Sequence, residues 1–251
     1  MNNELPLSLK DIYSTGYTTD RKGERRKAID STVSEAEVNT LMKIVSDLKA
    51  VITLETGVAF GASAIAICYA KKDLQSVDKM HYGVDPNQSG FYANAASVSL
   101  EREKLDNQFT LLEGPSHTEI PKLIDRGVKL DFAFIDGWHT FDYTLIDFFL
   151  IDKMLKVGGM VAFHDMQALS KQKVLRFILS HRKYKIQKQY AVKGNESLIK
   201  TLKFFVWRGF KYPLLLRSWF YWHYQLFNSS GLIVLQKMQD FEPNYDFFKR
   251  F

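Results

Sequence analysis

Several features are scarce or missing in this sequence of 251 residues, and each excludes a class of protein. The single cysteine, Cys68, rules out a disulfide within the chain and fits a reducing compartment. Residues 1–10 contain no basic segment followed by a long apolar stretch, so we expect no secretory signal. No run approaches the roughly 18 uninterrupted apolar residues that span a bilayer. A cytoplasmic location is therefore expected.

The sequence does contain enough apolar residues, 46% of the total, to build a sizeable core. The net charge of +6 is concentrated late in the chain, where residues 171–217 hold thirteen Lys and Arg against one acid, Glu196. Such a cluster can attract nucleic acid, anionic lipid or an anionic acceptor. A solvated basic surface explains it equally well.

Short apolar runs alternate with helical patterns through the middle of the chain. Ser34 and Glu37 form a capping box at the start of a first helix. Strands are then expected at 51–55, 81–85, 109–113, 130–136 and 160–164, and helices at 62–70, 97–105, around Pro121, 143–155 and 168–180.

The alternation predicts an α/β fold with a parallel, Rossmann-like doubly wound sheet and helices on both faces. Pro121 suits a first helical turn, and Gly158 with Gly159 is expected to end the helix over 143–155. Residues 184–192 and 231–236 are candidates for a sixth and a seventh strand. Ligands of such sheets bind where the carboxyl ends of the strands meet.

Two of these strand ends carry residues suited to a nucleotide-like cofactor. The segment from Glu55 to Gly61 holds two glycines where the first strand turns into a helix, whose free N–H groups can bind a carboxylate. Asp85 ends the second strand, where an acid can accept hydrogen bonds from both hydroxyls of a ribose. A tight turn and a turn-forming Asp before Pro86 are the alternatives. Ser116, after the third strand, can bound an adenine ring.

Four segments carry a family resemblance: 54–63, 83–86, 134–139 and 155–165. On them the chain resembles class I S-adenosylmethionine (SAM)-dependent methyltransferases, specifically the small O-methyltransferases related to macrocin and mycinamicin sugar methylation. The resemblance implies a seven-stranded sheet whose last strand is antiparallel. It also implies that Glu55, Gly57, Gly61 and Asp85 contact SAM. Ser63, Ser116 and Asp136 are further predicted contacts of the cofactor.

The ends of the fourth and fifth strands predict the chemical site. Asp136 and His139 follow the fourth strand, His164 and Asp165 end the fifth, and neighbouring strands would bring all four together. The resemblance makes His139 the general base that deprotonates the acceptor, with Asp136 beside it. A structural histidine that caps the next helix is the alternative.

A divalent metal such as Mg²⁺ is a further possibility at this site, held by Asp136, His164 and Asp165. In metal-dependent relatives an acid often stands where this chain has His164, and that departure favours a softer metal or none. The alternative is that the two Asp side chains hydrogen-bond loop backbone.

These features together predict a SAM-dependent methyltransferase that acts on a hydroxyl of a small molecule, a sugar or a lipid-linked acceptor. The alternatives are an NAD-dependent oxidoreductase and a non-catalytic binding protein of the same fold. The oxidoreductase is disfavoured because Ala59 stands where its Gly-x-Gly-x-x-Gly fingerprint needs glycine. A nucleic-acid methyltransferase is disfavoured because no Asn/Asp-Pro-Pro-aromatic motif occurs.

The expected organisation is an N-terminal helical segment over 1–50 and a methyltransferase domain over 51–251. That domain carries an aromatic and basic insertion at about 193–228. The insertion fits an acceptor lid, a peripheral helix at the inner membrane face, a homo-oligomer contact or additional core.

Overall fold

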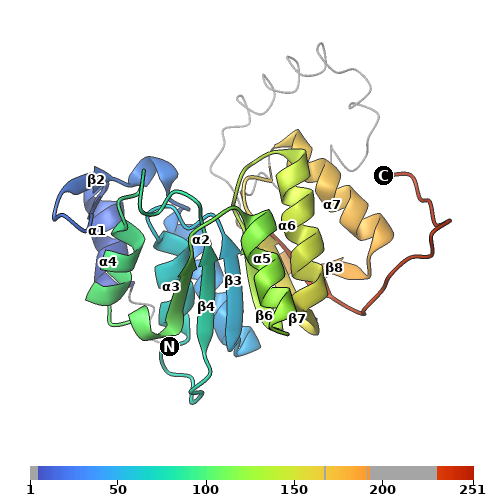
Figure 1. The fold of residues 1–251 in the computed structure, drawn as a ribbon, viewed down its shortest axis with the longest axis horizontal. Coiled ribbons are helices and arrows are strands. Elements are labelled where there is room, and N and C mark those ends of the chain that lie inside the picture. The colour runs from blue at the N-terminus through green and yellow to red at the C-terminus, as the bar shows by residue number, and fades with distance from the viewer. Residues whose placement is uncertain (1–4, 167, 191, 193–230) are drawn as a thin grey trace, which may run out of the picture.

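The computed structural model describes residues 5–166, 168–190, 192 and 231–251. Its centre is a mixed sheet of seven strands: β3 (Ile52–Thr56), β4 (Met80–Val84), β5 (Phe109–Leu112), β6 (Leu130–Ile135), β7 (Leu155–Phe163), β8 (Tyr184–Ile186) and β9 (Ile233–Lys237). Their spatial order is β5-β4-β3-β6-β7-β9-β8 (Figure 1). β3 to β7 are parallel, whereas β9 runs antiparallel to both β7 and β8. The expected doubly wound sheet with an antiparallel last strand is confirmed.

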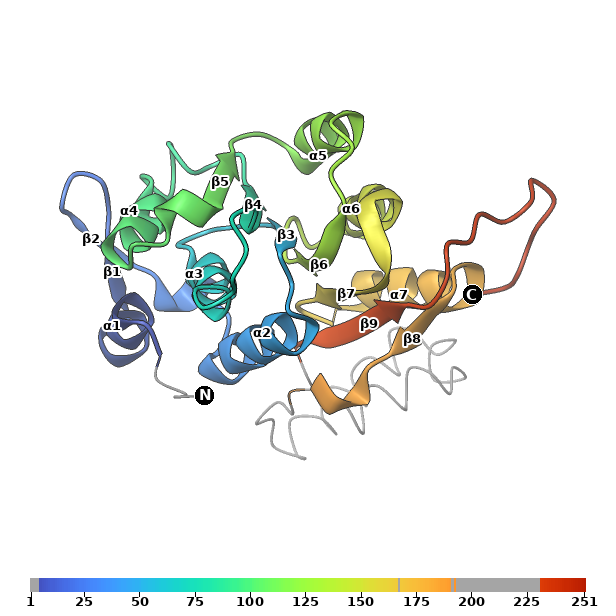
Figure 2. The same cartoon turned by 90° about the horizontal axis from the view of Figure 1, so that it is seen from below.

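Helices cover both faces of this sheet (Figure 2). They are α1 (Leu7–Thr15), α2 (Glu35–Leu48), α3 (Ala62–Ala70), α4 (Ala95–Arg102), α5 (Ser116–Asp125), α6 (Phe141–Met154) and α7 (Leu169–His181). β6 shows how one strand serves two cores, because successive side chains point to opposite faces. Phe132 and Phe134 pack in the cluster that includes α2 and α3, and Ala133 and Ile135 pack in the cluster that includes α5, α6 and α7.

The start of α2 follows from its sequence. The Ser34 hydroxyl accepts a hydrogen bond from the backbone N–H of Glu37, and the Glu37 carboxylate accepts one from the Ser34 N–H at 2.8 Å. This capping box satisfies two backbone donors that a helix start leaves unpaired. α3 begins directly after Gly61, and Cys68 within it is fully buried. Both helices lie where the sequence predicts them.

Two local predictions are wrong. Gly158 and Gly159 do not end a helix, because α6 stops at Met154 and β7 begins at Leu155. The glycines lie inside that strand, next to a shift in its register with β6. Gly158 has a φ of 88°, a backbone angle that residues other than glycine rarely adopt. Pro121 is an interior residue of α5, which begins five residues earlier, and not part of a first turn.

The N-terminal segment is more varied than the helical region expected from the sequence. Between α1 and α2 it forms a small antiparallel sheet, β1 (Tyr17–Thr19) with β2 (Arg25–Lys27), and a short 3₁₀ helix, η1 (Ile29–Ser31). Two more 3₁₀ helices, η2 (Asp106–Gln108) and η3 (Lys188–Tyr190), precede β5 and follow β8. The sixth strand is therefore shorter than the expected 184–192.

Within the residues that the structure describes, every helix is too short or too polar to cross a membrane. The insertion at about 193–228 lies outside those residues. The roles considered for it therefore stay predictions from the sequence.

Candidate functional site

A cavity of about 690 Å³ lies where the carboxyl ends of the central strands meet. Its walls come from the segments that follow β3, β4 and β6, from the start of α5, and from His164 and Asp165 after β7. The segment 30–33, just before α2, closes another side. This is the edge of the sheet at which doubly wound folds bind ligands.

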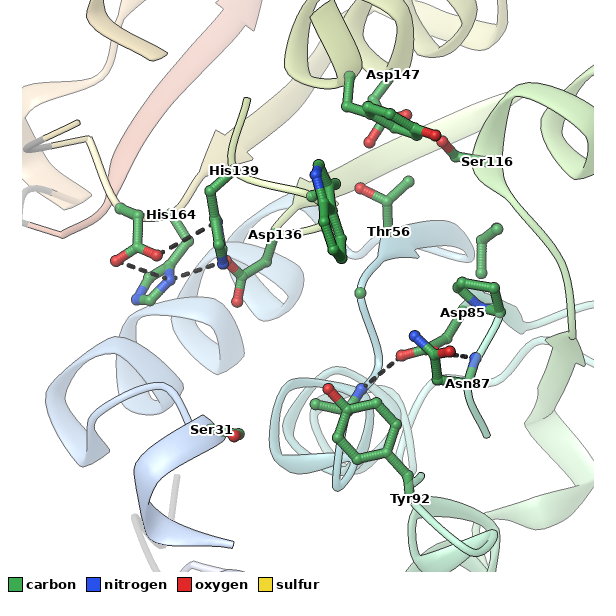
Figure 3. Close-up of a pocket in the computed structure, with 18 of the residues that line it drawn as sticks. Ser31, Thr56, Asp85, Asn87, Tyr92, Ser116, Asp136, His139, Asp147 and His164 are labelled. Carbon is green, nitrogen blue, oxygen red and sulfur yellow. Dashed lines mark hydrogen bonds and ion pairs between the residues drawn. The ribbon is translucent and has the colours of Figure 1, made fainter. Parts of the chain in front are cut away.

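Asp85 organises the loop after β3 as well as lining the cavity. Its Oδ2 accepts hydrogen bonds from the backbone N–H groups of Val58 at 3.0 Å and Ala59 at 2.9 Å. Its Oδ1 accepts one from the N–H of Asn87 at 2.8 Å (Figure 3). Two carboxylate oxygens offer about four acceptor sites, so acceptor capacity remains for a ligand.

The two glycines of this loop are needed for different structural reasons. Gly57 lines the cavity with φ +84°, and a Cβ there would lie 2.3 Å from the backbone oxygen of Asp136. Gly61 does not line the cavity, and a Cβ there would lie 2.7 Å from the Cβ of Ala96 in α4. Gly57 therefore lets the loops after β3 and β6 touch, and Gly61 lets α3 approach α4.

Not every residue predicted to bind the cofactor reaches the cavity. Four of them line it: Gly57, Asp85, Ser116 and Asp136. Three others are not among the residues that line it: Glu55, Gly61 and Ser63.

Glu55 instead takes part in a buried contact beneath the site. Its Oε1 lies 3.4 Å from Nε2 of His81, and both side chains are fully buried. Burial lowers the pKa of His81 although the nearby carboxylate opposes that shift, which favours a neutral imidazole.

Asp136 and His164 form the tightest contact of the predicted chemical site. Nδ1 of His164 lies 2.9 Å from Oδ1 of Asp136, and its Nε2 lies 3.3 Å from Oε1 of Glu37. Burial disfavours the charged ring, but the two carboxylates outweigh it and raise the pKa of His164 to about 10. His164 is therefore an imidazolium between two carboxylates at neutral pH.

His139 has the opposite electrostatic character. Its side chain is 55% exposed, and its Nδ1 lies 3.3 Å from Oδ2 of Asp165. Partial desolvation, reinforced by the charge of Lys171, lowers the pKa of His139 despite the nearby carboxylates. A neutral imidazole that lines a cavity can accept a proton from a bound ligand.

The residues that could hold a metal differ from the predicted set. Asp136, His139 and Asp165 offer ligand atoms that all lie within 4.8 Å of one another. His164 directs both ring nitrogens at carboxylates, so it has no lone pair to offer in this arrangement. In the candidate metal site, His139 thus stands where the sequence analysis predicts His164.

The sequence analysis missed several residues that line the cavity, among them Thr56, Tyr92 and Asp147. Asp147 is the most unusual, because it is a carboxyl from α6 with 1% exposure. Burial raises the pKa of Asp147, against the opposing effect of the hydroxyls of Ser116 and Thr56. An acid inside the apolar run from Leu145 to Phe149 was the available signal.

A family comparison agrees with this arrangement. Residues 54–166, which run from β3 to just past β7, match the family model described as a methyltransferase domain. This segment is a methyltransferase domain. The expected enzyme class, a SAM-dependent methyltransferase, is thereby confirmed. None of the curated proteins matches the chain in sequence.

Solved methyltransferases share the fold. An O-methyltransferase from Bacillus cereus in complex with SAH has a TM-score of 0.63 at 13% identity, covering 93% of this chain and 92% of that chain. TomG from Streptomyces achromogenes, an O-methyltransferase of tomaymycin synthesis in complex with SAM, has a TM-score of 0.61 at 15% identity, covering 94% and 92%. A SAH-bound methyltransferase from Podospora anserina has a TM-score of 0.58 at 15% identity, covering 73% and 83%. At these identities the likeness establishes the fold.

Proposed function

We propose that this methyltransferase transfers the methyl group of SAM to a hydroxyl oxygen of a small molecule or a sugar, with His139 as the general base. The observation that carries the proposal is a neutral, cavity-facing imidazole beside Asp136 and Asp165. In Figure 3, His139 and Asp136 lie on one side of the cavity, and Asp85 and Asn87 lie on the other. The two sides suit an acceptor and a nucleoside.

The proposed cofactor site is built from the loops after β3, β4 and β5. Asp85 would accept hydrogen bonds from the ribose hydroxyls, and the bare backbone at Gly57 allows a ligand to approach closely. Ser116 would lie beside the base. When bound there, SAM supplies an electrophilic methyl group on a sulfonium centre.

The protein's own contribution is orientation of the acceptor and removal of its proton. His139 accepts the proton of the acceptor hydroxyl as the oxygen attacks, so the nucleophile gains negative character only where it reacts. Asp165, 3.3 Å from Nδ1 of His139, orients the ring and stabilises the imidazolium that forms. Asp136 is held in place by His164.

A divalent metal also fits Asp136, His139 and Asp165, whose oxygens and nitrogen suit a first-row transition metal better than Mg²⁺. Such an ion would lower the pKa of an acceptor hydroxyl bound to it. It would also occupy the nitrogen of His139, so the two roles compete. We assign His139 the role of general base and not of metal ligand, because Asp165 already orients its ring for proton transfer.

The acceptor is proposed to be a neutral hydroxyl compound, either free, as part of a sugar or on a lipid carrier. Asp30, Ser31 and Thr32 line the cavity and add hydroxyl and carboxylate groups to its wall. Such groups hydrogen-bond polyols, whereas the added carboxylate of Asp30 disfavours a polyanion such as nucleic acid. Cytoplasmic location, peripheral membrane contact and homo-oligomerisation stay predictions.

The experiment that tests the proposal is calorimetric titration of the purified protein with SAM, SAH and, separately, NAD. We expect SAM and SAH to bind in the micromolar range, NAD not to bind, and Asp85→Ala to weaken SAH binding at least about tenfold. Asp125→Ala, an exposed acid at the end of α5, is the matched control and should bind as the wild type does. A preference for NAD would refute the proposed function.

A further inference from the structure

The cavity wall contains two buried polar atoms whose hydrogen-bonding capacity is unused. By donor–acceptor geometry, Oδ1 of Asp147 and Oγ1 of Thr56 make no hydrogen bond among the described residues, and both residues line the cavity. The Thr56 hydroxyl lies near enough to Asp147 to oppose the rise in its pKa, but the two groups do not satisfy each other in this geometry. Both side chains are at most 1% exposed. A buried polar atom without a partner costs roughly 1–3 kcal/mol, so such atoms call for an explanation.

Both side chains lie next to Gly137, the residue that follows Asp136: a Cβ there would lie 3.2 Å from Oδ2 of Asp147 and 3.3 Å from Oγ1 of Thr56. Figure 3 shows Asp147 and Ser116 together at one end, Thr56 between them and the centre, and His164 and His139 at the other end. Ser116 begins α5 after β5, and Asp85 directly follows β4, which neighbours β5 in the sheet. A nucleoside whose ribose meets Asp85 would therefore extend its base toward Ser116, Thr56 and Asp147.

The chemistry of the two unpartnered groups matches one edge of an aminopurine. A carboxyl oxygen accepts a hydrogen bond, and a threonine hydroxyl can donate one. The six-membered ring of adenine presents an exocyclic amine, which donates, next to a ring nitrogen, which accepts. The complementary pair would satisfy both buried atoms at once.

We propose that Asp147 recognises the exocyclic amine of the cofactor's purine, with the Thr56 hydroxyl donating to the adjacent ring nitrogen. This inference rests on the proposed function, because it assumes that the cavity holds SAM. It makes Asp147 a residue that determines specificity for the cofactor and is separate from the residues that handle the acceptor. It also accounts for an acid in the buried face of α6.

A purely structural role makes a different prediction. A Cβ built on Gly137 would lie 3.2 Å from Oδ2 of Asp147, so the carboxyl packs closely under the loop after β6. If Asp147 only supports this loop, its removal would weaken every ligand of the cavity to the same extent. Recognition of the amine would instead weaken only ligands that carry the amine.

The test is a double-mutant-type thermodynamic cycle, in which the Asp147 side chain and the exocyclic amine of the ligand are removed separately and together. Calorimetry would compare SAH with its 6-deamino analogue, in which hydrogen replaces the amine, on the wild type, Asp147→Ala and the control Asp125→Ala. We expect loss of the amine to weaken binding about tenfold in the wild type and in the control, and to have no effect in Asp147→Ala. Asp147→Asn, whose side-chain carbonyl still accepts a hydrogen bond, should retain part of the difference.

The outcomes separate the inference from the function on which it rests. Equal binding of both ligands by the wild type, or an equal loss in the wild type and Asp147→Ala, would overturn the role of Asp147 while SAM binding stands. If neither ligand binds the wild type, the proposed function itself fails and the inference with it. If Asp147→Ala does not fold, the wild-type comparison and Asp147→Asn still decide.

Discussion

The imidazole of His164 bridges Asp136 in the cavity wall and Glu37 at the start of α2, at 2.9 Å and 3.3 Å. The same Glu37 carboxylate completes the capping box with Ser34. One histidine thus links a residue of the chemical site to a helix start that lies far away in the sequence. The link is electrostatic, so its strength should depend on pH.

Glu37→Gln tests the charge of this link while keeping the helix cap, because glutamine also serves in a capping box. The pKa of His164 is raised above its unfolded value of roughly 6.5, so the stability it contributes is complete below about pH 6.5 and is lost as the pH rises toward 10. Thermal unfolding between pH 6 and 10 should show this decline in the wild type and a smaller decline in Glu37→Gln. The same decline in stability with pH in both proteins would contradict a charge interaction between His164 and Glu37.

The pKa of Glu37 is shifted in the other direction. Burial raises it, but hydrogen bonds and the charge of His164 outweigh burial and hold the pKa of Glu37 below its usual range. Its contribution to stability is therefore present above about pH 4.5 and is lost as the pH falls through the lowered value. The same unfolding series, extended to pH 3, should show that acid-side loss in the wild type and not in Glu37→Gln.

Gly57→Ala should destabilise the protein far more than Gly127→Ala, although both glycines have a positive φ. The added Cβ would lie 2.3 Å from the backbone oxygen of Asp136, whereas at Gly127 (φ +71°) a Cβ meets nothing within 4 Å. Gly127→Ala should cost only the backbone strain, about 1 kcal/mol. We expect Gly57→Ala to lower Tm further and to abolish SAH binding. Equal unfolding temperatures for the two variants would show that the loop after β3 yields easily.

Replacing the proposed base should affect the reaction and leave cofactor binding intact. His139→Gln should lower kcat by roughly 10²–10⁴-fold with an accepted hydroxyl compound, while SAH binds as before. Because the pKa of His139 is lowered, the neutral base persists into mild acid, and kcat/KM should fall only below about pH 6.5. A variant with full activity would make His139 structural. The control Asp125→Ala should leave the profile unchanged.

The central sheet and its helices could be predicted because their signals are local. Short apolar runs and a capping box fix where β3, α2 and α3 lie, and the lengths of the connections favour parallel pairing. The strand across Gly158 and Gly159 was not predictable in the same way. A glycine pair usually indicates the end of a helix, but here the strand is stabilised by pairing with β6. That pairing is a long-range contact, which no local pattern encodes.

In the site, too, some residues could be predicted from local signals and others are placed by long-range contacts. Gly57, Asp85, Asp136 and His139 end or follow strands, so topology alone gathers them at one edge. The contact between His164 and Glu37 joins segments 127 residues apart in the sequence, and no local pattern encodes it. The hairpin of β1 and β2 was missed because each strand has only three residues, although Asp20 and Gly23 mark its turn.

Metal dependence follows from the competition for His139. If the ring nitrogen that accepts the proton can also bind a metal with Asp136 and Asp165, a tightly bound transition metal should inhibit the enzyme rather than activate it. We expect Zn²⁺ to inhibit methyl transfer, EDTA to restore it, and Mg²⁺ to have little effect. Calorimetry with Zn²⁺ alone should show binding to the wild type and much weaker binding to His139→Gln. Activity that disappears with EDTA and returns with Mg²⁺ would instead make the metal, held by the two Asp side chains, the group that activates the acceptor.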